Sequence, residues 1–84
     1  MTVNSGSSRE SKVHQLDVCG LKCPMPILRA KKALAVMQRG ELLEVLATDP
    51  AVPDDFAAFA RQTGHTLVDV RDLDGRWLLT LQRK

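Results

Sequence analysis

The sequence lacks an apolar run long enough to cross a bilayer, and it lacks the apolar core of a secretory leader. It therefore predicts neither membrane insertion nor export. Cysteine is also scarce: the chain has two, Cys19 and Cys23, only four positions apart. A disulfide between them would close a very small loop and stabilise little, so a structural disulfide is not expected. We expect the protein in a reducing cytoplasm.

A strong excess of one charge is absent as well. Twelve basic and ten acidic residues give a net charge of +2. A general nucleic-acid-binding protein is more basic than this, so strong direct binding of nucleic acid is not expected. The basic residues nevertheless gather in one segment between Gly20 and Gly40, which contains no acid: they are Lys22, Arg29, Lys31, Lys32 and Arg39. This segment is either a local basic surface for a partner or an ordinary solvated helix face.

The length of 84 residues fits one domain with a two-layer core, but it is too short for a deep, enclosed active site. The first residues are rich in Ser, Thr, Asn and charge, and they cannot bury enough apolar surface to offset the entropy of ordering. We therefore expect a flexible tail over residues 1–14 and a folded domain over residues 15–84.

Within that domain, alternation and helical periodicity of apolar residues define six elements. The sequence predicts strands at 14–18, 41–48, 66–71 and 77–82, and helices at 24–38 and 53–63. Strand-helix-strand units predict parallel pairing with right-handed crossovers, and the Asp74-Gly75 turn predicts a final hairpin that adds one antiparallel strand. The expected fold is an α/β (α+β) two-layer sandwich, β-α-β-α-β-β, with a mixed four-stranded sheet and both helices on one face.

The junction between the first strand and the first helix places one thiol in a distinctive setting. Pro24 and Pro26 are tolerated in a first helical turn, where backbone N–H groups have no internal partner. This predicts Cys23 at about the N-cap, with the positive end of the helix dipole beside its sulfur. Lys22 adds a positive charge and Gly20 allows the backbone to turn, so we expect a stabilised thiolate. The alternative is that Cys23 is simply a small buried apolar residue.

The helical pattern also predicts which side chains near this thiol face solvent. The apolar stripe that faces the core consists of Ile27, Ala30, Leu34 and Met37. Met25, Leu28 and Lys32 fall on the opposite side, so Met25 and Leu28 are predicted to be exposed apolar residues close to Cys23. Single exposed apolar residues are common, but this position suggests a surface on which a partner docks.

From Leu16 to Arg83 the chain resembles the TusA/SirA-like family of small sulfur-carrier proteins. The most specific part of the resemblance is Leu16-Asp17, then Gly20-Leu21, then the Cys-Pro-x-Pro signature Cys23-Pro24-Met25-Pro26. A second set occurs at the second crossover: Asp49-Pro50, Asp55, Phe59 and Gly64-His65. Cys19 is a second thiol that the signature does not require.

The resemblance implies a two-layer sandwich with a mixed sheet, and a sulfurtransferase-type carrier that needs no cofactor. Cys23 would receive sulfane sulfur as a persulfide from a cysteine desulfurase or a rhodanese-type donor and pass it to an acceptor protein. Related routes lead to tRNA thiolation, molybdenum-cofactor assembly or sulfur oxidation. Relatives are small monomeric carriers, so a monomer is expected.

Three alternatives stay open on the sequence alone. Cys19 could act as a resolving thiol, which would make Cys19 and Cys23 a redox switch. The two cysteines and the two histidines could hold a metal, although their spacing is a weak signal and no metal site is predicted. Finally, the chain could be a non-catalytic regulatory binding module in which the basic helix docks a partner and Cys23 is structural.

Overall fold

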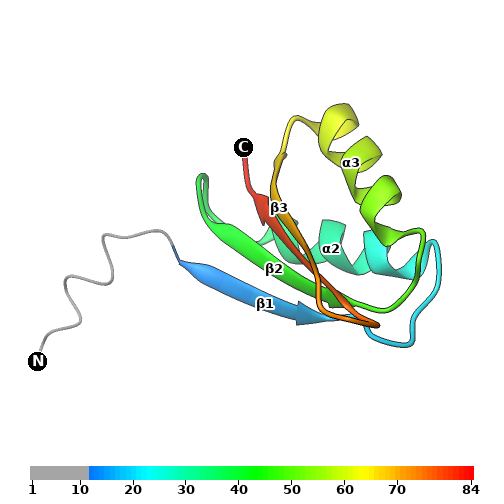
Figure 1. Cartoon of the computed structure of the whole chain (residues 1–84). Helices are drawn as coiled ribbons and strands as arrows, with labels where there is room; N and C mark the ends of the chain where they lie inside the picture. Colours follow the sequence, from blue (N-terminus) through cyan, green and yellow to red (C-terminus); the bar gives the residue numbers. More distant parts are fainter. Residues whose placement is uncertain (1–11) are drawn as a thin grey trace, which may run out of the picture.

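The computed structural model describes residues 12–84, which form the predicted order of strands and helices. Figure 1 shows a twisted sheet with both helices packed on one side of it. The six elements are β1 (Val13–Asp17), α2 (Met25–Ala35), β2 (Leu42–Ala47), α3 (Val52–Thr63), β3 (Thr66–Asp72) and β4 (Trp77–Gln82). The predicted two-layer α+β fold with a mixed four-stranded sheet is therefore confirmed.

The strands lie in the order β1-β2-β4-β3. β1 pairs with β2 in parallel, and β4 pairs with both β2 and β3 in antiparallel register. The first strand-helix-strand unit thus pairs as predicted. The second does not, because β4 folds back from the final hairpin into the position between β2 and β3. β2 and β3 consequently run in the same direction without being neighbours.

The core lies between the helices and one face of the sheet. Along β2 and β4 every second side chain is buried, as expected for strands covered on one face: the buried residues are Leu43, Val45, Ala47, Leu79 and Leu81. The helices contribute one stripe each, with Ala30, Leu34, Phe56 and Phe59 among the buried residues. On the opposite face Leu46 and Leu78 are half-buried, and no other layer within residues 12–84 covers them.

The first helix is shorter than predicted. It begins at Met25 rather than Pro24, since its first helical bond is donated by the Leu28 N–H to the Pro24 carbonyl. It ends at Ala35 rather than Gln38, because the next two N–H groups bond three residues back and tighten the last turn. The second helix begins at Val52, one residue before the prediction, and ends where expected.

The chain enters the sheet slightly earlier than the predicted domain boundary. Val13 and His14 lie opposite Leu42 and Leu43 in the parallel β1–β2 ladder, whereas the predicted strand begins at His14 and the predicted tail runs to residue 14. The remainder of that predicted tail, residues 1–11, lies outside the described residues. The edge of the domain is therefore β1 from Val13 onward.

Candidate functional site

The loop that carries Cys23 is fastened to the end of β2. The Cys23 N–H donates to Asp49 Oδ2 at 2.9 Å, and the Gly20 N–H donates to Thr48 Oγ1 at 2.8 Å. The second oxygen of the same carboxylate, Asp49 Oδ1, accepts the Ala51 N–H at 3.1 Å. Asp49 therefore ties the Cys23 loop to the start of α3 and fixes the backbone beneath the thiol.

Gly20 gives this loop its turn. Its φ is +80°, in the left-handed region that favours glycine. The Leu21 N–H then donates to the Val18 carbonyl at 3.1 Å, which reverses the chain just after β1. As a result the thiol lies at the edge of the sheet rather than inside the sandwich.

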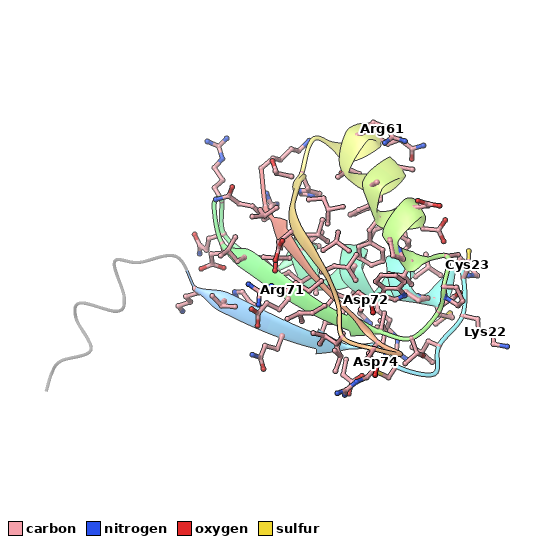
Figure 2. All side chains as sticks on the ribbon, in the orientation of Figure 1. Lys22, Cys23, Arg61, Arg71, Asp72 and Asp74 are labelled. Atoms are coloured by element: carbon pink, nitrogen blue, oxygen red, sulfur yellow. The ribbon has the colours of Figure 1, made fainter. Side chains whose placement is uncertain are left out.

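Cys23 is exposed, one residue before the cap of α2. The predicted N-cap position is wrong by one residue, because Pro24 is the cap and Met25 and Pro26 are the first helical residues. In Figure 2 the Cys23 sulfur lies at the rim of the molecule, beside the beginning of α3, and the Lys22 side chain extends in a different direction into solvent. A partner protein can thus reach the sulfur directly.

Acidic groups, not basic ones, dominate the electrostatics at this sulfur. Partial loss of hydration at the foot of α3 raises the pKa of Cys23, a hydrogen bond to the Asp55 carboxylate raises it further, and the negative charges of Asp55 and Asp49 add to the effect. The prediction of a stabilised thiolate is therefore wrong. Carboxylates that face the sulfur disfavour its ionised form, and Lys22 is directed elsewhere.

Lys22 acts on a neighbouring acid. The pKa of Asp49 is lowered by the hydrogen bonds it accepts from the Ala51 and Cys23 N–H groups and, to a smaller extent, by the charge of Lys22. An ionised Asp49 keeps both backbone N–H groups bonded. Lys22 thus supports the carboxylate that anchors the loop, and it does not offset the negative charge at the thiol.

Cys19 has a separate environment. Its N–H donates to Asp17 Oδ1 at 2.9 Å, and partial burial together with the Asp17 side chain raises the pKa of its thiol. Both cysteines are free thiols, Cys19 being partly buried and Cys23 exposed. The Cys19 thiol thus faces the Asp17 carboxylate on β1, and the Cys23 thiol faces the Asp55 carboxylate on α3.

A groove between the two helices opens at Cys23. It has a volume of about 310 Å³, and it is lined on one side by Pro24, the cap of α2, and by Ile27 and Lys31 of α2. The α3 wall includes Asp55 at the thiol end and Phe59 further along. The thiol therefore lies at one end of a shallow surface channel.

The predicted docking residues lie on the outer side of α2. Met25 is 38% exposed and Leu28 is 48% exposed, and Lys32 is also exposed. Pro26 is instead fully buried and packs the first turn of α2 against the core. The predicted docking residues therefore share a solvent-facing surface, separate from the groove.

Thr48 and Asp49 are the positioning residues to which sequence reasoning gave no role. A signal was available, because the carboxyl ends of parallel neighbouring strands meet at one edge of a sheet. Cys23 follows β1 and Asp49 follows β2, so their proximity follows from the parallel β1–β2 pairing. Asp55 is brought to the same edge by the first turn of α3.

The two histidines lie away from this groove opening. His14 Nε2 is 2.8 Å from Glu41 Oε1, and His65 Nδ1 accepts the Lys84 N–H at 3.1 Å. Within residues 12–84 no three metal-ligating side chains come together. Over the same residues neither helix is long and apolar enough to span a membrane.

The fold and the loop define a small α+β domain that presents a single exposed thiol where the sheet meets its first helix. The family model for "Sulfurtransferase TusA" matches residues 14–83, and the chain belongs to this family.

Relatives of known name agree with this assignment. A protein of Neisseria meningitidis serogroup A, named as a candidate sulfur carrier, is 64% identical over 69 residues, covering 82% of this chain and 93% of its own. The sulfur carrier protein TusA of Allochromatium vinosum is 46% identical over 69 residues, covering 82% and 91%. A crystal structure of a SirA-like protein from Desulfitobacterium hafniense, 26% identical, superposes with a TM-score of 0.71 over 83% of this chain and 95% of its own.

Proposed function

We propose that this protein is a sulfur carrier that accepts sulfane sulfur as a persulfide on Cys23 and relays it to an acceptor protein. The observation that carries the proposal is the exposed Cys23 thiol, held at the rim by the Asp49 hydrogen bond in a chain of the TusA family. A thiol that must meet a second protein's sulfur needs this accessibility more than it needs an enclosed pocket.

The transfer is an exchange between sulfur atoms. The Cys23 thiolate attacks the outer sulfur of a donor persulfide, a new S–S bond forms on Cys23, and the donor's S–S bond breaks to release its cysteine as a thiolate. In the second half the acceptor's thiolate attacks the outer sulfur on Cys23, and Cys23 leaves. No net oxidation occurs, so neither an oxidant nor a cofactor is consumed.

The neighbouring residues have distinct parts in this proposal. Gly20 turns the loop, and Pro24 and Pro26 set the start of α2 next to the thiol. The raised pKa lowers the fraction of Cys23 present as thiolate in the free protein, which limits its oxidation between transfers. Reaction with a partner then requires that the partner offset the charge of Asp55 and Asp49.

The donor we propose is a cysteine desulfurase or a rhodanese-type protein, and the acceptor belongs to a route such as tRNA thiolation or cofactor assembly. These partners and the free thiols fit a reducing cytoplasm. We place part of the docking surface on Met25, Leu28 and Lys32, which are exposed on one side of α2. A Met25→Ser, Leu28→Ser double variant should bind its donor more weakly, and unchanged affinity would remove this surface from the proposal.

Intact-mass spectrometry tests the carrier chemistry directly. The reduced protein is incubated with a cysteine desulfurase and cysteine, or with a rhodanese and thiosulfate, beside Cys23→Ser and Cys19→Ser variants. A gain of about 32 Da that is lost in Cys23→Ser and kept in Cys19→Ser is the expected result. Absence of added sulfur, with a loss of about 2 Da that needs both cysteines, would instead indicate a redox switch.

A further inference from the structure

The groove that starts at Cys23 continues along the whole length of α2. A second hollow of about 180 Å³ shares Lys31, Phe59 and Thr63 with the first and extends to Arg83. Because they share these three residues, the two hollows adjoin each other between α2 and α3, and we refer to them together as the channel. Its floor is apolar, because Ile27 and Phe59 line it.

The two ends of this channel carry opposite charge. Asp55 lies at the Cys23 end, where Asp49 also acts on the thiol, whereas Lys31 and Arg83 lie toward the other end. Within residues 12–84 the ion pairs are His14–Glu41 and Arg71–Asp69, so Asp55, Lys31 and Arg83 form no side-chain ion pair there. The channel is thus a dipolar surface with an apolar middle.

Arg83 is held in place at the far end. Its Nε donates to the Leu34 carbonyl at 2.9 Å, and its Nη1 donates to a main-chain oxygen of Lys84 at 3.1 Å. A guanidinium anchored in this way is a preorganised charge and does not need to be ordered on binding. Lys31, one α2 turn beyond Ile27, supplies a second cation, whose side chain is exposed.

We propose that this channel receives an extended segment of the sulfur-exchanging partner, with a cysteine over Cys23, a cationic residue beside that cysteine, and a carboxylate near Lys31 and Arg83. An apolar side chain between them would cover Ile27 and Phe59. This inference rests on the proposed function and names the chemistry of the partner segment. The opposite charges at the two ends of the channel determine the direction in which the segment lies along it.

Helix geometry gives the spacing of the segment. From Pro24 to Lys31 the chain rises by about 10 Å along α2, at about 1.5 Å per residue. An extended chain covers that distance in about three residues at about 3.3 Å each. The carboxylate of the partner segment therefore lies about three positions from its cysteine.

Peptides of reversed polarity test this inference. The complementary peptide is acetyl-Lys-Cys-Ala-Leu-Glu-amide, and its control, acetyl-Glu-Cys-Ala-Leu-Lys-amide, has the same composition. Each is prepared as the mixed disulfide with thionitrobenzoate and mixed with reduced Cys19→Ser protein, in which Cys23 is the reacting thiol. Attack by Cys23 on the peptide sulfur forms a protein–peptide disulfide and releases thionitrobenzoate, whose absorbance gives the rate; intact mass identifies the product.

The complementary peptide should react about tenfold faster at low salt, the size expected when two exposed charge pairs change from attractive to repulsive. High salt should reduce this preference. Lys31→Glu should also reduce it, whereas Arg29→Glu, a charge reversal at an exposed α2 residue that does not line the channel, should preserve it. Circular dichroism shows whether both variants are folded.

Equal rates for the two peptides would overturn the inference, as would equal effects of Lys31→Glu and Arg29→Glu. A glutathione–thionitrobenzoate disulfide that reacts as fast as the complementary peptide would also overturn it, since the channel would then not favour the complementary segment over glutathione. The trapping reaction uses no sulfane sulfur. Failure of Cys23 to gain sulfur, with peptide selectivity intact, would therefore count against the carrier function alone.

Discussion

Replacing Gly20 by Ala tests whether a left-handed residue positions the Cys23 loop. The φ of Gly20 is +80°, and a Cβ added there would meet nothing within 4 Å. Steric overlap with residues beyond the two chain neighbours is thus excluded as a source of destabilisation. What remains is the cost of placing an L-residue in the left-handed region, about 1–2 kcal/mol.

Gly40 provides a matched control for this change. Its φ is +82° and its surroundings are equally open, but it lies in the loop between α2 and β2, away from Cys23. Gly20→Ala and Gly40→Ala should therefore lower the free energy of unfolding by similar amounts. For a domain of this size, about 1 kcal/mol corresponds to a fall in Tm of about 4–8 °C. Gly20→Asn should lose less, because Asn tolerates this conformation.

The two variants should differ in sulfur uptake. Urea unfolding measures stability, and the rate of mass gain at Cys23 is measured at a temperature where both variants are folded. Only Gly20→Ala should slow the uptake, since Gly20 also bonds Thr48 and precedes the thiol. If Gly20→Ala cost no stability, or if Gly40→Ala slowed uptake equally, the account of this loop would be refuted.

Three further predictions concern charge and packing. Asp55→Asn should lower the pKa of Cys23 and speed its alkylation by iodoacetamide at pH 7, while Asp54→Asn, the adjacent exposed acid, should not; equal rates would remove Asp55 from the site. The pKa of Glu41 is held below its ordinary value of 4.5, chiefly by a hydrogen bond from a backbone N–H. The ionised carboxylate therefore contributes fully to the stability of the fold above pH 4.5, and this contribution is lost as the pH falls through the lower pKa of Glu41 in the folded state. Urea titrations should accordingly show Glu41→Gln less stable than wild type at pH 7 and little different in strong acid. Leu79→Ala, at a side chain with no exposure, should cost about 2–5 kcal/mol in the same assay, and a loss below 1 kcal/mol would contradict the assigned core.

Much of the fold was predictable because the apolar patterns within single strands and helices agree with the way these elements pack. The alternation of Trp77, Leu79 and Leu81 predicted the side of β4 that faces the helices, and the stripe of Phe56 and Phe59 predicted the buried side of α3. The position of β4 between β2 and β3 was not predictable in the same way. A hairpin strand can add to either side of its partner, and alternation within one strand does not say which side is open.

The location of Cys23 was predicted from the sequence, but the electrostatics around its sulfur were not. The positions of the prolines identified Cys23 as the residue at the junction between β1 and α2. Helical periodicity correctly predicted that Met25 and Leu28 are exposed. The sign of the shift in the Cys23 pKa depends on Asp55, which is distant in sequence and reaches the thiol only when α3 packs beside α2. Sequence neighbours such as Lys22 suggested the opposite sign, because adjacency in the chain says little about where a long side chain points.

The carboxylates at Cys23 connect partner binding to reactivity. In the free protein they raise the pKa of the thiol, and thiolate is the form that exchanges sulfur. In the proposed docking mode the same carboxylates hold a cation of the partner segment, which offsets their negative charge at the sulfur. Binding of the cation and ionisation of Cys23 are thermodynamically linked. A cation that favours the thiolate form of Cys23 is therefore bound more tightly by the thiolate form, and by the same free energy. A partner that lacked the cation could still cover the groove, but it would leave Cys23 in its protonated, slowly reacting form.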